Sequence, residues 1–150
     1  MAQTTFISST FWTERIGSAA GLKTLEVMGN VKPWLKVTET GCKVRRIWRD
    51  LATQYGLDIS IGGLPAISTF AFNSPNSLEY KTLVTQEMLK KGFLAGTAFY
   101  ACTEHSDDIL EAYKSHMAPI FGLIKECEEG RDIGSILDGE VCHAGFKRLN

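Results

Sequence analysis

The amino-acid sequence predicts an α+β fold in which helices flank a small, mostly antiparallel sheet. Helix-period apolar patterns alternate with short β-type segments along the 150 residues, and 44% of the residues are hydrophobic. That content suits one ordinary domain with a sizeable core. We expect a hairpin over residues 58–73 to pair with a strand over 93–102. Helices are expected beside this sheet near residues 31–55, 77–91 and 106–128.

Two helices are predicted ahead of the hairpin. The first runs from about Thr13 toward Met28, with Glu14 in its acidic first turn and Gly29-Asn30 as its stop. The second has Pro33 in its first turn and Gly56 just past its end. Its apolar residues recur every three or four positions and predict one buried stripe: Trp34, Val37, Gly41, Val44, Trp48, Leu51 and Tyr55.

The hairpin is predicted from alternation and turn residues. Apolar and polar residues alternate around Ile61, and I-S-T-F-A-F over residues 67–72 is typical of a second strand. Between them, Gly62-Gly63 and Pro65 predict the turn. Sequence therefore places two antiparallel strands side by side.

The remaining elements follow from caps and composition. A helix over residues 77–91 is closed by Gly92, and the small and apolar residues of 93–102 predict a strand buried on both faces. Ser106 can cap a last long helix, which Pro119 should bend. The apolar stripe predicted for this helix is Ile109, Tyr113, Met117, Ile120 and Ile124. The final twenty residues are expected to be irregular.

Composition excludes several classes of function. A net charge of -1 gives no long-range field for nucleic acid or an anionic membrane surface. No apolar run approaches the length of a bilayer span, and the first residues lack the layout of a signal peptide. Four scattered cysteines are expected to be reduced thiols. The expected compartment is the cytoplasm.

Two Cys-His groups raise the question of a metal. Cys102-x-x-His105 and the adjacent Cys142-His143 supply the four ligands that a structural zinc needs. Their spacing is poor, because closed zinc sites usually take two chelating pairs with two to four residues between members. We therefore expect no structural metal. The simpler interpretation makes Cys102 a small core residue and places His105 just before a helix cap.

A hydroxyl cluster marks the start of the chain. Ser8, Ser9 and Thr10 lie in T-F-I-S-S-T-F-W-T-E-R, where a β-prone segment turns into the first helix. Free backbone N–H groups and hydroxyls converge at such a position, and they can bind an anion. Residues of the same types also cap helices. The local sequence leaves both interpretations open.

Three segments together resemble one known family. S-S-T-F-W-T-E-R-I-G-S-A-A-G-L-K-T-L-E-V-M resembles the stretch after the cofactor lysine in class III pyridoxal-phosphate-dependent aminotransferases, especially the glutamate-1-semialdehyde 2,1-aminomutase-like branch. M-L-K-K-G-F-L-A-G-T-A-F-Y-A-C-T-E-H-S-D-D-I is similar to the helix, strand and H-[ST]-x-x-D-I helix start of that branch, and V-C-H-A-G-F-K-R-L-N is similar to the tail of some members. The resemblance covers nearly the whole chain and matches only the C-terminal portion of the family. It implies the small C-terminal domain of a fold-type I enzyme, with residues 1–28 joining a large cofactor domain to residues 29–150.

The resemblance also implies roles for three residues. Thr10, with Ser9 beside it, matches the position that binds the phosphate of pyridoxal 5'-phosphate in the neighbouring subunit of a homodimer. Thr97 matches a substrate-lining position where a Glu often stands in the aminomutase branch. Threonine there leaves aminotransferase and aminomutase activity both open, and the Thr97 hydroxyl can equally be bonded to backbone.

The catalytic lysine of the family is expected upstream of this chain. None of the lysines present lies in the family's lysine motif, so no catalytic residue is assigned here. The chain is expected to be a C-terminal fragment of an enzyme that moves an amino group between a small-molecule donor and a carbonyl acceptor, and to be inactive alone. The alternative is a self-standing, non-enzymatic α+β binding or interaction module, including a metal-binding one. A lysine-bearing domain encoded upstream of Met1 would discriminate the two.

Overall fold

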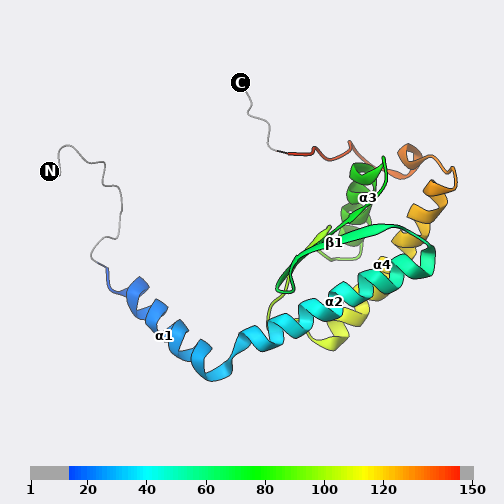
Figure 1. Ribbon diagram of the computed structural model, residues 1–150. Helices are drawn as coiled ribbons and strands as arrows, with labels where there is room; N and C mark the ends of the chain where they lie inside the picture. The colour runs from blue at the N-terminus through cyan, green and yellow to red at the C-terminus, as the bar shows by residue number, and fades with distance from the viewer. Residues whose placement is uncertain (1–13, 146–150) are drawn as a thin grey trace, which may run out of the picture. The chain divides into compact units, whose positions relative to one another are not determined.

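The computed structural model describes residues 14–145, and the predicted α+β class is confirmed (Figure 1). Three antiparallel strands in the order β1-β2-β3 are accompanied by four α-helices in this described range. The elements in chain order are α1 (Ile16–Val31), α2 (Pro33–Tyr55), β1 (Ile59–Leu64), β2 (Ile67–Phe72), α3 (Ser77–Lys90), β3 (Ala98–Tyr100), α4 (Asp107–Glu128) and a 3-10 turn (Ile133–Ile136).

The chain divides into two compact units, one ending at Pro33 and one beginning at Trp34. The first unit contains α1, and none of the residues of α1 is buried within the described part of the chain. The second unit contains the sheet and the other helices. The predicted domain boundary between residues 28 and 29 stays a prediction.

Helix α1 starts and ends later than predicted. Glu14 precedes the helix rather than lying in its first turn, and Gly29-Asn30 lie inside it. The residue that ends α1 is Lys32, with a left-handed φ of 48°. Pro33 disfavours the helical conformation in the residue before it, so it ends α1 here. Glycine and asparagine are permitted to end a helix, but nothing requires them to do so.

Helices α2 and α4 run side by side in the same direction, as Figure 1 shows. Lys43, in the middle of α2, pairs with Asp107, the first residue of α4, at 2.7 Å. Further along both helices, Trp48 donates a hydrogen bond to Tyr113. At the end of α2, Tyr55 lies against Gly122, where a Cβ would be 3.3 Å from the ring. The predicted terminator Gly56 is confirmed, with a φ of 63°.

The hairpin is confirmed, but its turn lies after Leu64 rather than at Gly62-Gly63. Strand β1 pairs with β2 from Ile59↔Phe72 to Leu64↔Ile67, so Gly62 and Gly63 are strand residues and Pro65-Ala66 form the turn. Gly63 has a φ of 77°, and a Cβ on it would lie 2.2 Å from the carbonyl oxygen of Ile67. The glycine is required by that close approach at the strand end.

The predicted strand over residues 93–102 is mostly wrong. Only Ala98–Tyr100 form β3, and this strand pairs with β2 on one side alone within the described range. Leu94 is 96% exposed and Tyr100 is 70% exposed, so the segment is not buried on both faces. A run of small and apolar residues does not distinguish a central strand from an edge strand preceded by a loop.

The core lies between the helices and one face of the sheet. On β2, exposed and buried residues alternate, which places Ser68, Phe70 and Phe72 on the inner face. Trp48 packs on Phe70 with ring centroids 4.7 Å apart. The helices contribute all the other buried apolar residues of the described core: Val44, Leu51, Ala52, Tyr80, Leu83, Val84, Met88, Leu110, Tyr113, Met117, Ile120, Phe121, Ile124 and Cys127.

Two details of the predicted helical stripes differ. Ile109 is 42% exposed and its neighbour Leu110 is buried, so the buried face of α4 starts one residue later than predicted. Trp34 is 48% exposed, and the first buried residue of α2 is Thr40, so the N-terminal part of the predicted stripe is not buried. The Ser106 cap is confirmed, since its hydroxyl accepts a hydrogen bond from the Ile109 N–H at 3.3 Å. None of the described helices is long and apolar enough to cross a membrane.

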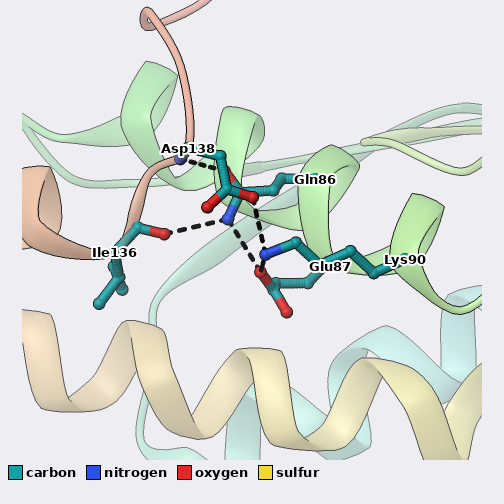
Figure 2. A network of polar contacts seen from close by, with 5 residues as sticks. All are labelled: Gln86, Glu87, Lys90, Ile136 and Asp138. Atoms are coloured by element: carbon teal, nitrogen blue, oxygen red, sulfur yellow. Dashed lines mark hydrogen bonds and ion pairs between the residues drawn. The ribbon is translucent and has the colours of Figure 1, made fainter.

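The segment after α4 lies along α3, and its polar contacts hold it there (Figure 2). The Gln86 amide makes two backbone contacts, donating to the Ile136 carbonyl at 3.0 Å and accepting from the Asp138 N–H at 2.7 Å. Lys90 pairs with Glu87 at 2.7 Å and with Asp138 at 2.8 Å. Burial opposes ionisation of Glu87, but hydrogen bonds from Lys90 and Gln86 outweigh it and lower its pKa.

Candidate functional site

A hollow of about 430 Å³ lies beside the edge strand β3. The loop after α3 contributes Phe93 and Leu94 to its wall, and the start of α4 contributes Ile109 and Tyr113. The other lining residues are those of strand β3 together with Gly92, Ala95, His105 and Leu110. The hollow is therefore built from three segments that the small sheet and α4 bring together.

The polar group best placed at this hollow is the His105 imidazole. Its ring lies against that of Phe99, with centroids 4.8 Å apart and an angle of 36° between the planes. The Nδ1 atom accepts a hydrogen bond from the Cys102 N–H at 3.1 Å. Because Nδ1 is an acceptor, the neutral ring carries its proton on Nε2. His105 thus offers a side-chain N–H donor at a largely apolar hollow.

The floor of the hollow is fixed by Tyr113. Its side chain is 4% exposed, and its hydroxyl accepts a hydrogen bond from Trp48 Nε1 at 2.8 Å. Burial raises the pKa of the Tyr113 phenol well above its ordinary value, so the phenol is neutral. Among the described residues, no Asp, Glu, Lys or Arg lines the hollow. The site is uncharged as well as largely apolar.

Thr97 lies next to the hollow without lining it. It is half-buried and directly precedes β3, whose first residue, Ala98, does line the hollow. The Thr97 carbonyl accepts a hydrogen bond from the Phe70 N–H at 2.9 Å, which fixes its backbone against β2. Ser9 and Thr10 lie outside the described residues. The roles of all three residues stay predictions.

The Cys-His groups have different surroundings. Cys102 is exposed, so the interpretation of this residue as a small core residue is wrong; Cys127 is the buried thiol. The Cys142 N–H donates to the Thr82 hydroxyl at 3.0 Å, on α3. Within residues 14–145, no group of three or more His, Cys, Asp or Glu side chains is arranged to hold a metal ion.

The described residues do not by themselves form a pocket for pyridoxal phosphate. The cofactor needs an enclosed lysine, and every described lysine is exposed or half-exposed. The hydroxyls predicted to bind its phosphate are those of Ser9 and Thr10, outside the described range. The described residues supply the neutral hollow and helix α3, which ends just before the first residue that lines it.

Sequence reasoning missed the hollow and its His105 donor. Phe99 and His105 are six residues apart across a loop, and periodicity says nothing about contacts of that kind. The only signal was the Cys102-x-x-His105 spacing, for which we expected no structural metal and placed His105 just before a helix cap. In the structure this spacing closes a turn through the Cys102 N–H.

Comparison with solved structures supports the fold. The FumI protein of Sphingopyxis sp. MTA144, solved in its PLP internal aldimine form, superposes with a TM-score of 0.71 at 14% sequence identity. This chain therefore shares the fold of part of that PLP-bound protein. The match covers 89% of this chain and 33% of the FumI chain, so the chain spans about one third of the length of that protein. No protein-family model and no curated protein matches the sequence.

Proposed function

We propose that this chain forms the C-terminal part of a pyridoxal-phosphate-dependent enzyme of the class III aminotransferase or aminomutase type, which acts as a homodimer. The observation that carries the proposal is the fold likeness to one third of a solved PLP protein chain. The order of the three sequence segments described above supports the same family. The reaction is the transfer of an amino group between a small-molecule donor and a carbonyl acceptor.

The cofactor, when bound, supplies the chemistry of amino-group transfer. This chain contributes binding and orientation. The Thr10 hydroxyl, with Ser9 beside it, donates a hydrogen bond to the cofactor phosphate of the neighbouring subunit. Thr97 lies on the substrate side. The catalytic lysine comes from a domain outside these 150 residues.

The surface of α1 supports a larger assembly. At about 100° per residue, its large apolar side chains span roughly 240° of the helix circumference. They are Ile16, Leu22, Leu25, Val27, Met28 and Val31. Polar side chains fill the remaining sector, where Lys23 pairs with Glu26. A helix this apolar is normally enclosed by protein, and an isolated helix of 16 residues is marginal in water.

Because a coiled-coil partner covers only a narrow stripe, one neighbouring helix would leave much of this surface in water. A large domain that encloses α1 on several sides accounts for it better. We therefore assign α1 to the seam between this chain, a cofactor domain and the partner subunit.

The proposal is tested first at the gene. The coding sequence upstream of Met1 should continue in frame into a large domain, with a lysine some thirty residues before Thr10, a spacing expected from the family resemblance. The longer protein should bind pyridoxal phosphate and transfer an amino group, and the 150-residue chain alone should not. An upstream sequence with no such domain, together with a chain that functions alone, would contradict the proposal and favour a self-standing binding module.

A further inference from the structure

We propose that the hollow beside β3 binds a neutral ketone or aldehyde with an apolar body, whose carbonyl oxygen accepts a hydrogen bond from His105 Nε2. The inference goes beyond the proposed function and does not rest on it, because every residue involved belongs to the described part of this chain. It can be tested without cofactor.

The apolar body of the ligand follows from the lining. Phe93, Leu94 and Ile109 present apolar side chains around a volume of about 430 Å³. Pockets of about 300–1,000 Å³ with a few placed polar groups are typical of small-molecule sites. Leu94 is almost fully exposed at the rim, so covering it removes apolar surface from water.

The tautomer of His105 indicates that the ligand presents a hydrogen-bond acceptor to this ring. Nδ1 is occupied by the Cys102 N–H, so Nε2 is the nitrogen left to donate. Stacking on Phe99 restricts the ring orientation. An acceptor oxygen on the ligand meets this N–H.

The backbone of β3 adds further polar groups, both N–H donors and carbonyl acceptors. The Thr97 carbonyl and the Ala101 N–H both bond to β2 and its turn, accepting from Phe70 and donating to Ala66. Successive residues of a strand point their backbone groups to opposite sides. The backbone groups of Ala98 and Tyr100 therefore face the free edge, and both residues line the hollow.

The neutral charge of the ligand follows from what the lining lacks. Among the described residues no cationic side chain lines the hollow to compensate a carboxylate, and no carboxylate lines it to compensate an ammonium group. Transfer of an uncompensated charge into an apolar site is unfavourable. A keto acid is therefore a poorer fit than a simple ketone of the same size.

Three probes of similar shape test the inference: acetophenone, ethylbenzene and benzoate. Each is titrated into the ¹⁵N-labelled 150-residue chain, and amide shifts around the hollow are followed by NMR. Acetophenone should bind about three- to tenfold more tightly than ethylbenzene, the size of one neutral hydrogen bond. Benzoate should bind more weakly than acetophenone.

Matched variants then locate the hydrogen bond. His105→Phe keeps an aromatic ring beside Phe99 but removes the N–H, so it should abolish the preference for acetophenone over ethylbenzene. His116→Phe is the control, because His116 also contacts an aromatic ring, that of Phe93 at 5.5 Å, but does not line the hollow. It should leave the preference unchanged.

A measurement on the unaltered chain keeps the test independent of variant folding. The ¹⁵N shifts of the His105 ring should report a proton on Nε2, and that proton should shift when acetophenone is added. A proton on Nδ1, equal affinity for acetophenone and ethylbenzene, or tightest binding by benzoate would each overturn the inference.

Discussion

Trp48 Nε1 donates a hydrogen bond to the Tyr113 hydroxyl at 2.8 Å, and both side chains lie in the core between α2 and α4. Tyr113→Phe would leave the indole N–H buried without its partner. The free energy of unfolding should fall by about 1–3 kcal/mol, the cost of an unsatisfied buried donor. Urea denaturation measures the change. Tyr100→Phe, at a side chain 70% exposed, is the control and should be nearly neutral. Equal losses in the two variants would contradict the role of this hydrogen bond.

The same phenol predicts how stability depends on alkaline pH. Burial raises the pKa of Tyr113 above the ordinary value of 10.0, so the unfolded chain releases this proton at a lower pH than the folded chain does. Above about pH 10 the folded state binds more protons than the unfolded state, so the free energy of unfolding falls as the pH rises. Below about pH 10, Tyr113 contributes no pH dependence.

The slope tests this assignment. One such group contributes about 1.4 kcal/mol per pH unit in the alkaline range. Unfolding measured by urea from about pH 8 to about pH 11 should show the decline, and Tyr113→Phe should have a shallower one. Burial also raises the pKa of Tyr80, so part of the slope should remain in the variant. An unchanged slope would show that Tyr113 titrates normally.

Adjacent glycines in β1 should respond differently to the same substitution. A Cβ on Gly63 would lie 2.2 Å from the Ile67 carbonyl oxygen at a φ of 77°, whereas a Cβ on Gly62 meets the Thr69 hydroxyl at an ordinary 3.4 Å. Gly63→Ala should therefore lower the free energy of unfolding by about 1–3 kcal/mol. Gly62→Ala should leave it nearly unchanged. Thermal unfolding of the two variants compares them directly. A neutral Gly63→Ala would show that the hairpin end adapts at little cost.

The elements most accurately predicted from sequence are those fixed by local signals. Pro33, Gly56 and Ser106 mark helix ends through their own backbone or hydroxyl chemistry, and the structure has each in that role. The class of the fold followed from these ends and from the periodicity between them.

The features that the sequence could not predict depend on which elements lie side by side in the folded chain. Whether Leu94 and Tyr100 are buried depends on β3 being the edge of the sheet, which composition does not reveal. The hollow likewise depends on where α4 lies against the sheet. His105 became a candidate donor only once its Nδ1 was seen to accept the Cys102 N–H.

The contact between Gln86 and the segment after α4 gives a prediction about local opening. The amide of Gln86 accepts from the Asp138 N–H at 2.7 Å and donates to the Ile136 carbonyl at 3.0 Å. Gln86→Ala removes both bonds, so hydrogen exchange at the Asp138 amide should accelerate by about tenfold, as expected for about 1.4 kcal/mol of local stability. Exchange in the middle of α4 should not change.

Lys81→Ala is the matched control for that experiment, since Lys81 is an exposed residue of the same helix. Its effect on the Asp138 amide should be small. If Gln86→Ala accelerates exchange equally throughout the second unit, then Gln86 stabilises the whole domain rather than this segment.

The central claim is most directly tested by the affinity of the full-length dimer for pyridoxal phosphate when Thr10 is changed. A hydrogen bond to a charged group contributes about 1.5–3 kcal/mol, so Thr10→Ala should weaken cofactor binding by about one to two orders of magnitude, and Thr10→Ser should largely preserve it. Titration of the cofactor, followed by its absorbance, gives the dissociation constants. In hybrids with lysine-deficient subunits, the affinity should follow the subunit that donates Thr10. Unchanged affinity in Thr10→Ala, or a full-length protein that binds no cofactor, would contradict the account.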